Sequence, residues 1–291
     1  MDKIRKWDKD GLLRNAAFTP LHHAISLLAD DFPSLQDCNA LLAAHHPPVV
    51  VDSGLPVRFV SQEYGRLPFQ FQYEPRCYLR GEVPTRADNW HDLFNALVWF
   101  AFPQTKAAIN ARHYRALTVS KEVAKPNGRG MVRDVNTLFD ESGILIVYSD
   151  AKQAELLRQF RWKELFWHQR HQLQSGMGFY LFGHALYEKM LNPYLGLTGH
   201  GLLLQVEEDF FSWTEARRIG RTDELLAAYF SDDHHCRDTR ELTPVPLLGI
   251  PGWCAENGME AYYDNTAYFR PGRQSRAART PLSTAPSSVA G

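Results

Sequence analysis

The stretch "NWHDLFNALVWFAFPQTKAAINARH" (Asn89–His113) decides the fold, because it combines a strongly apolar run with polar side chains in its midst. At about 100° per residue, the apolar residues of 89–102 cover well over half the circumference of a helix. Such a helix has no wide charged face, so it is buried nearly all round and its polar strip must face partners or a cavity. That strip holds His91, Asp92 and Asn95.

A second helix is predicted to start at Pro103, a residue that suits the first turn of a helix. Lys106, Asn110 and His113 are spaced i, i+4 and i+7, so they line one face of this helix over 103–117. If the two helices pack as neighbours, their polar strips converge on a shared site. The alternative is that these residues are buried hydrogen-bonding groups that only hold loops and helix ends in place.

A second polar cluster lies in "GFYLFGHALYEKMLNPYLGLTGH" (residues 178–200), for which we predict a helix over 179–191. His184 and Glu188 are four residues apart on one helical face, where they could ligate a metal or form a general base with its orienting carboxylate. The HExxH signature of zinc proteases is absent. An ordinary polar pair on a helix is the other interpretation. Gly183 permits close approach by another backbone.

Acidic residues precede the strongest predicted strand of the chain, "GILIVYS" at 143–149. Asp134, Asp140 and Glu141 stand in a loop that we expect to lead into this strand, and the Asp-Glu-Ser-Gly sequence is typical of a turn. We retain Asp140 as a candidate site residue at the strand end. The loop also carries Arg133, which could bind an anion. Its glycines do not have the spacing of a nucleotide-binding loop.

The composition indicates a folded globular protein and excludes several classes of partner. Of 291 residues, 44% are hydrophobic and 12% aromatic, which excludes disorder over most of the length. Thirty-two basic residues against 33 acidic ones provide no excess charge for a nucleic-acid backbone or an anionic membrane. We therefore expect no nucleic acid and no membrane among the partners, leaving a small-molecule ligand. The oligomeric state is left open.

The N-terminal sequence lacks the apolar segment of a secretory signal, and no uncharged run is long enough for a transmembrane helix. The four cysteines are widely spaced and form no CxxC pair, which argues against a zinc knuckle or a redox dithiol. We expect a cytoplasmic protein with reduced thiols.

The pattern of predicted elements favours an α+β fold: a helix-rich single domain with a small mixed sheet. Runs of helix alternate irregularly with short apolar strands, without the regular βαβ order of a doubly wound sheet. We place this domain at residues 1–273 and a disordered tail at 274–291. Near the C-terminus, a Pro- and Gly-rich segment with aromatic anchors (Trp253, Tyr262, Tyr263 and Phe269) is expected to wrap the main body or to form one wall of a pocket.

Several stretches resemble a bacterial domain-of-unknown-function family, number 3025. The resemblance is carried by "VPTRADNWHDLFNALVWFAFPQTKAAINARH", "NTLFDESGIL", "FGHALYEKMLNPYLGLTGH", "LLGIPGW" and "YYDNTAYFRP". It covers roughly Pro20 to Arg273 and implies a bacterial source and one continuous domain. It transfers no catalytic residue, so the candidate site rests on residue spacing alone.

The sequence favours an enzyme of hydrolase type with a buried pocket that acts by acid–base or metal-assisted chemistry on a small or phosphorylated substrate. The candidate catalytic or ligating residues are His91, Asp92, His113, Asp140, His184 and Glu188. The candidate substrate-binding residues are Asn95, Asn110, Arg112 and Arg133, with the arginines placed to neutralise an anionic group. A divalent metal is a candidate cofactor. The alternative is a non-catalytic binding or scaffolding protein whose polar strips are structural.

This hypothesis makes a geometric prediction: at least four of the six catalytic candidates converge on one pocket. A polar group left without a partner in an apolar core costs roughly 1–3 kcal/mol, and an isolated charge costs more. Helices that each carry a histidine with a polar neighbour satisfy these groups best by turning them toward one another.

Overall fold

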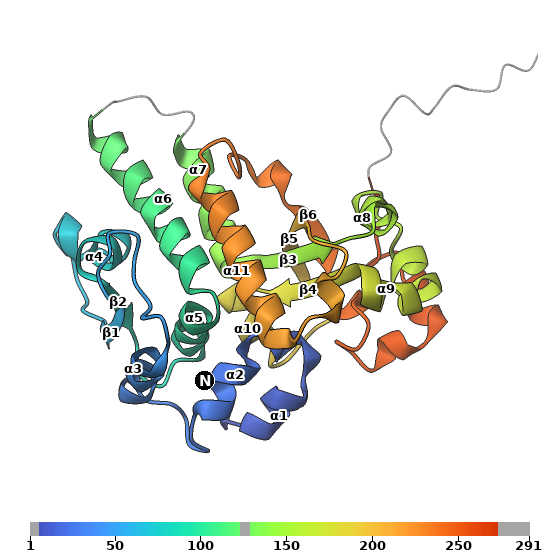
Figure 1. Cartoon of the computed structure of the whole chain (residues 1–291), viewed down its shortest axis with the longest axis horizontal. Helices are drawn as coiled ribbons and strands as arrows, with labels where there is room; N and C mark the ends of the chain where they lie inside the picture. Colours follow the sequence, from blue (N-terminus) through green and yellow to red (C-terminus); the bar gives the residue numbers. More distant parts are fainter. Residues whose placement is uncertain (1–5, 123–128, 273–291) are drawn as a thin grey trace, which may run out of the picture.

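The computed structural model describes residues 6–122 and 129–272, and the tail predicted from residue 274 lies outside this part (Figure 1). Within it the α-helices are α1 (Lys9–Arg14), α2 (His22–Leu27), α3 (Leu35–Ala44), α4 (Tyr73–Arg80), α5 (Trp90–Ala101), α6 (Pro103–Glu122), α7 (Arg129–Ser142), α8 (Ala151–Arg158), α9 (Arg170–Gly176), α10 (His184–Met190) and α11 (Glu215–Ser231). The strands are β1 (Arg58–Ser61), β2 (Glu82–Thr85), β3 (Gly143–Tyr148), β4 (Met177–Leu181), β5 (Thr198–Gln205) and β6 (Thr243–Pro246).

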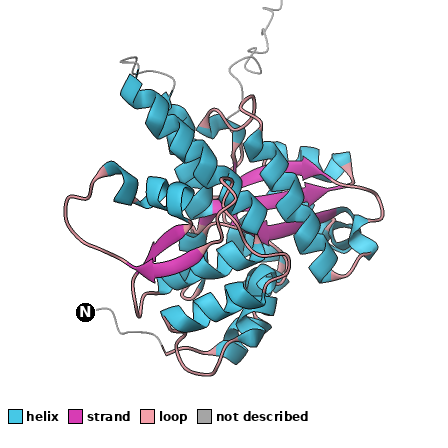
Figure 2. Ribbon diagram, turned by 60° about the vertical axis from the view of Figure 1, so that its left-hand side comes forward, coloured by secondary structure: helices cyan, strands magenta, loops and turns pink. Residues whose placement is uncertain are grey.

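Two small sheets are separate in space, as Figure 2 shows. The larger has the order β4-β3-β5-β6, with β3 parallel to β5 and the other pairs antiparallel. Strand β3 is central, and Ile144 to Val147 are fully buried, as expected for a β-branched strand covered on both faces. Strands β1 and β2 form a parallel pair beside α3 and α4. The fold is therefore helix-rich α+β with a small mixed sheet, as predicted.

Helix α5 is buried on almost all sides, as its sequence predicts. Every residue from Asp92 to Phe100 is buried. Asn89 caps the helix by accepting a hydrogen bond from the backbone N–H of Asp92 at 3.0 Å. Its apolar residues pack against α2, α3 and α10, so the polar strip is left facing the junction of α5 with α6, α7 and α10.

The start of α6 is held by a residue far away in the sequence. The Asp223 carboxylate, on α11, accepts hydrogen bonds from the backbone N–H groups of Gln104 (3.0 Å) and Thr105 (2.8 Å) and from the Thr105 hydroxyl (2.7 Å). These backbone groups have no partner within their own helix, so a buried carboxylate is a strong cap for them. Helices α6 and α11 consequently run side by side (Figure 1).

Four local predictions are wrong. Residues 129–142, predicted as loop and turn, form helix α7, so Asp140 and Glu141 lie in its last turn. Residues 73–80, predicted as strand or loop, form α4. The predicted helix at 179–191 begins only at His184, because Met177–Leu181 pairs with β3 as strand β4. The first predicted helix is a 3-10 turn followed by the short α2.

The C-terminal segment packs onto the main body through its aromatic side chains. Trp253, Tyr263 and Phe269 are buried, and Tyr262 is half-buried against them. The Tyr268 hydroxyl donates to the carbonyl of Leu197 at 2.6 Å. This arrangement supports the predicted wrap.

No helix in the described ranges, 6–122 and 129–272, is both long and apolar enough to cross a membrane.

Candidate functional site

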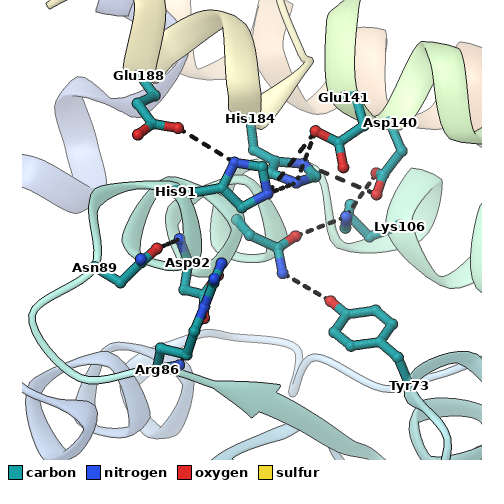
Figure 3. Close-up of polar contacts among 11 residues, drawn as sticks. Tyr73, Arg86, Asn89, His91, Asp92, Lys106, Asp140, Glu141, His184 and Glu188 are labelled. Carbon is teal, nitrogen blue, oxygen red and sulfur yellow. Dashed lines mark hydrogen bonds and ion pairs between the residues drawn. The ribbon is translucent and has the colours of Figure 1, made fainter. Parts of the chain in front are cut away.

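Four helices bring their polar side chains to one place, shown in Figure 3. Helix α5 contributes His91 and α10 contributes His184. Helix α7 contributes Asp140 and Glu141 from its C-terminal turn, and α6 contributes Lys106. Segments that are far apart in the sequence therefore build a single polar cluster inside an apolar surround.

Gly183 explains how α10 approaches the end of α7 so closely. A Cβ atom on Gly183 would lie 2.5 Å from the carbonyl oxygen of Glu141 and 2.5 Å from the backbone nitrogen of Ser142. Only glycine fits this contact without displacing the backbone. The contact sets His184, the next residue, directly beside Asp140 and Glu141.

His91, His184 and Glu141 point one donor atom each at a common centre. The two Nε2 atoms are 3.0 Å apart, and the Glu141 Oε2 atom lies 3.8 Å from His91 Nε2 and 3.6 Å from His184 Nε2. A triangle with these sides has a circumradius of about 2.0 Å, which matches the usual zinc–nitrogen and zinc–oxygen distances. Two imidazoles and one carboxylate also leave further coordination positions open, as in catalytic metal sites.

The outer ring nitrogens show why a cation belongs at this centre. His91 Nδ1 lies 3.3 Å from Glu188 Oε2, and His184 Nδ1 lies 3.8 Å from Asp140 Oδ2. Each carboxylate favours a proton on the Nδ1 atom that it faces, and a neutral ring then has its lone pair on Nε2. Two lone pairs and the Glu141 carboxylate would thus face one another. Either a metal ion or an additional proton must lie between them.

Burial and neighbouring charges tune the titratable groups of the cluster in different directions. Burial lowers the pKa of His184 to about 3, so its ring is neutral at pH 7, as a metal ligand must be. Burial also raises the pKa of Glu141, against the attraction of His91. For Asp140, burial opposes ionisation, but the charge of Lys106 outweighs it and the pKa is lowered.

A chain of hydrogen bonds extends from Asp140 to the far wall. The buried Lys106 ammonium donates to Asp140 Oδ1 at 2.6 Å and to Asn95 Oδ1 at 2.8 Å. The Asn95 amide in turn donates to the Tyr73 hydroxyl at 2.8 Å. Lys106 therefore neutralises Asp140 and leaves it fixed beside His184.

Asp92 holds a loop rather than facing the histidines. Its carboxylate accepts from the backbone N–H of Arg86 at 2.6 Å and from both ends of the Arg86 guanidinium, at 2.7 and 3.0 Å. These bonds close the connection between β2 and α5. The carboxylate is thus already paired, although it lies at the edge of the same cavity.

The cluster lines a cavity of about 320 Å³. Its lining residues are Gln62, Tyr73, Glu74, Pro84, Arg86, His91, Asp92, Asn95, His113, Thr137, Asp140, Glu141 and His184. Five of the six catalytic candidates are among them, so the predicted convergence is present. The sixth, Glu188, contacts His91 from behind. Their catalytic roles stay predictions.

The predicted substrate-binding residues are divided between this cavity and other places. Asn95 lines the cavity, whereas Asn110 bonds Glu74 Oε2 at 2.6 Å beside a smaller neighbouring void. Arg112 is buried and donates to the carbonyl of His235 at 2.5 Å, and Arg133 is exposed on α7. Neither arginine lines the cavity, so neither is placed to neutralise an anion bound there.

Glu141, Lys106, Tyr73 and Glu74 belong to the site but were not selected from the sequence. Glu141 was assigned to a turn. The apolar residues Val132, Val135 and Phe139 recur at helical spacing and could have revealed α7. Tyr73 and Glu74 lie on α4, whose clearest signal is the glycine that ends it: Gly81 has φ 65°.

The family described as "Protein of unknown function (DUF3025)" matches residues 57–273, and the chain belongs to this family. The matched range includes every residue of the cluster. Searches of curated proteins and of solved structures gave no match.

Proposed function

We propose that this member of the DUF3025 family is a metal-dependent enzyme of hydrolase type that acts on a small molecule. One divalent cation would be held by His91, His184 and Glu141. The observation that carries the proposal is the common point about 2.0 Å from three donor atoms of these residues. The adjoining cavity gives a substrate access to the open side of that point.

A divalent cation at this position would polarise a substrate carbonyl and lower the pKa of a bound water. The surrounding residues have supporting roles. Glu188 orients His91, and Asp140 orients His184 and is itself held by Lys106. Within the part of the chain that the structure describes, the His113 ring has no hydrogen-bond partner, so this imidazole is available to give a proton to a leaving group.

Metal analysis of the purified protein tests the proposal. After exposure to Zn²⁺, Mn²⁺ or Fe²⁺ and removal of free metal, we expect about one ion per chain. His184→Ala and Glu141→Gln should abolish binding. His234→Gln should retain it, because His234 is exposed and lies outside the cluster. Circular dichroism shows whether each variant is folded.

The metal-loaded protein should hydrolyse a panel of chromogenic esters and amides, and a chelator should remove this activity. Wild-type protein that binds no more metal than a folded Glu141→Gln variant would contradict the proposal. The histidine pair would then be held by a shared proton, and the scaffolding alternative would be favoured.

A further inference from the structure

Glu74 differs from the other carboxylates that line the cavity because it lacks a cationic partner. Asp92 is paired with Arg86, Asp140 with Lys106, and Glu141 faces the two histidines. Within residues 6–122 and 129–272, no basic side chain forms an ion pair with Glu74. Its carboxylate accepts one hydrogen bond, from the Asn110 amide at 2.6 Å, and is half-buried.

The positive groups near the cavity are already occupied. The guanidinium of Arg86 bonds Asp92 in two places, and the Lys106 ammonium bonds Asp140 and Asn95. A phosphate or carboxylate group on a ligand would find no unpaired basic side chain among the described residues, and would be repelled by Glu74. A half-buried carboxylate without a counter-ion favours a ligand that brings a positive charge.

We infer that Glu74 is a binding subsite for an ammonium group, and that the substrate is a small amine whose scissile ester or amide bond reaches His91, His184 and Glu141. This inference rests on the proposed function for its metal half. The Tyr73 hydroxyl stands beside the subsite on the same helix. Asn110 orients the carboxylate by its hydrogen bond.

Matched hydroxamates test the subsite on the zinc-loaded protein. The hydroxamate anchors each probe at the metal, and chains of about four to six carbons end in ammonium, methyl or carboxylate. By titration calorimetry we expect the best ammonium probe to bind on the order of tenfold more tightly than its methyl counterpart. The carboxylate probe should bind most weakly.

Glu74→Gln should equalise the affinities of the ammonium and methyl probes without changing that of the methyl probe, because glutamine can still accept the bond from Asn110. Glu155→Gln, on α8, is the matched control and should keep the ammonium preference. An equal affinity of wild-type protein for the two probes, or a preference for the carboxylate probe, would overturn the inference while leaving metal binding intact.

A second measurement needs no metal. Butylammonium and butyrate are titrated against the metal-free full chain, and backbone amide signals are followed by NMR. Butylammonium should shift the signals of residues 73–74 in the wild type but not in Glu74→Gln, and butyrate should shift neither. If no hydroxamate binds to protein incubated with zinc, the proposed function fails, and the butylammonium titration still decides whether Glu74 is an ammonium subsite.

Discussion

At the scale of single residues, the two histidines of the cluster are held to different degrees. The His184 side chain is 6% exposed and is fixed by the close packing at Gly183, whereas that of His91 is 27% exposed. His91 therefore depends more on a contact that orients its ring. That contact is Glu188, a surface carboxylate on α10 that faces Nδ1.

We predict that Glu188→Gln lowers the metal affinity of the site by about 10-fold, because outer carboxylates fix the tautomer and basicity of a ligating histidine. Competition against a chromophoric chelator measures the affinity. Glu208→Gln is the control, since Glu208 lies on the exposed segment after β5. If Glu188→Gln and Glu208→Gln both bind like wild type, the His91 ring is oriented by something other than Glu188.

The sequence was sufficient to select both histidines but not their shared carboxylate. His91 and His184 stand out because each is a polar residue in an apolar helix. Glu141 follows Asp140 directly, so the choice between them depends on which faces the centre, and that is fixed by the rotation of α7. The spacing argument cannot supply this rotation when the segment is assigned to a turn.

At the scale of elements, long amphipathic or apolar patterns predicted structure well, and short segments set by tertiary pairing did not. Helices α5 and α6 and strand β3 follow from periodicity, capping and composition. Strand β4 was assigned to a helix because its five residues have no strong period of their own, and hydrogen bonds to β3 define it. Helix α4 contains Pro75 in its first turn, which the sequence alone suggested was a break.

Helix α4 is joined to the β1–β2 pair by Glu82, and this connection can be tested by pH. The Glu82 carboxylate is buried; Arg76 donates to it at 2.6 Å, and Arg58 and Arg80 lie beside it. Burial alone would raise its pKa, but the three arginines outweigh burial and the pKa is lowered. A carboxyl group with a lowered pKa stabilises the fold above its unfolded pKa, and this contribution is lost as the pH falls through the folded pKa.

We predict that Glu82→Gln lowers the free energy of unfolding by about 3 kcal/mol at pH 7, because Arg76 is left buried without its main partner. The difference from wild type should shrink once the pH falls below 4.5, the ordinary glutamate value. Urea unfolding at pH 7 and under acid conditions measures both quantities. A difference that does not change with pH would mean that Glu82 acts through packing or neutral hydrogen bonds.

At the scale of the whole molecule, the candidate site ties together segments that are distant in the chain. Its three donor residues lie near positions 90, 140 and 185, on α5, α7 and α10, and α10 packs against both of the other helices. A ligand that needs all three donors can bind only after these helices have assembled. Its binding energy is then added to the stability of the folded state.

We therefore predict that zinc at about 100 times its dissociation constant raises the free energy of unfolding by about 2.7 kcal/mol, and the melting temperature by about 5 °C. His184→Ala should show no such shift, because one donor is missing, and His234→Gln should shift like wild type. Calorimetry also tests our proposal that residues 1–273 form one domain. In that case a single transition moves as a whole, because no part can unfold while the rest retains the metal. Two transitions of which zinc moves only one would contradict the single domain, and a wild-type melting temperature indifferent to zinc would show that the folded protein does not bind zinc at the site.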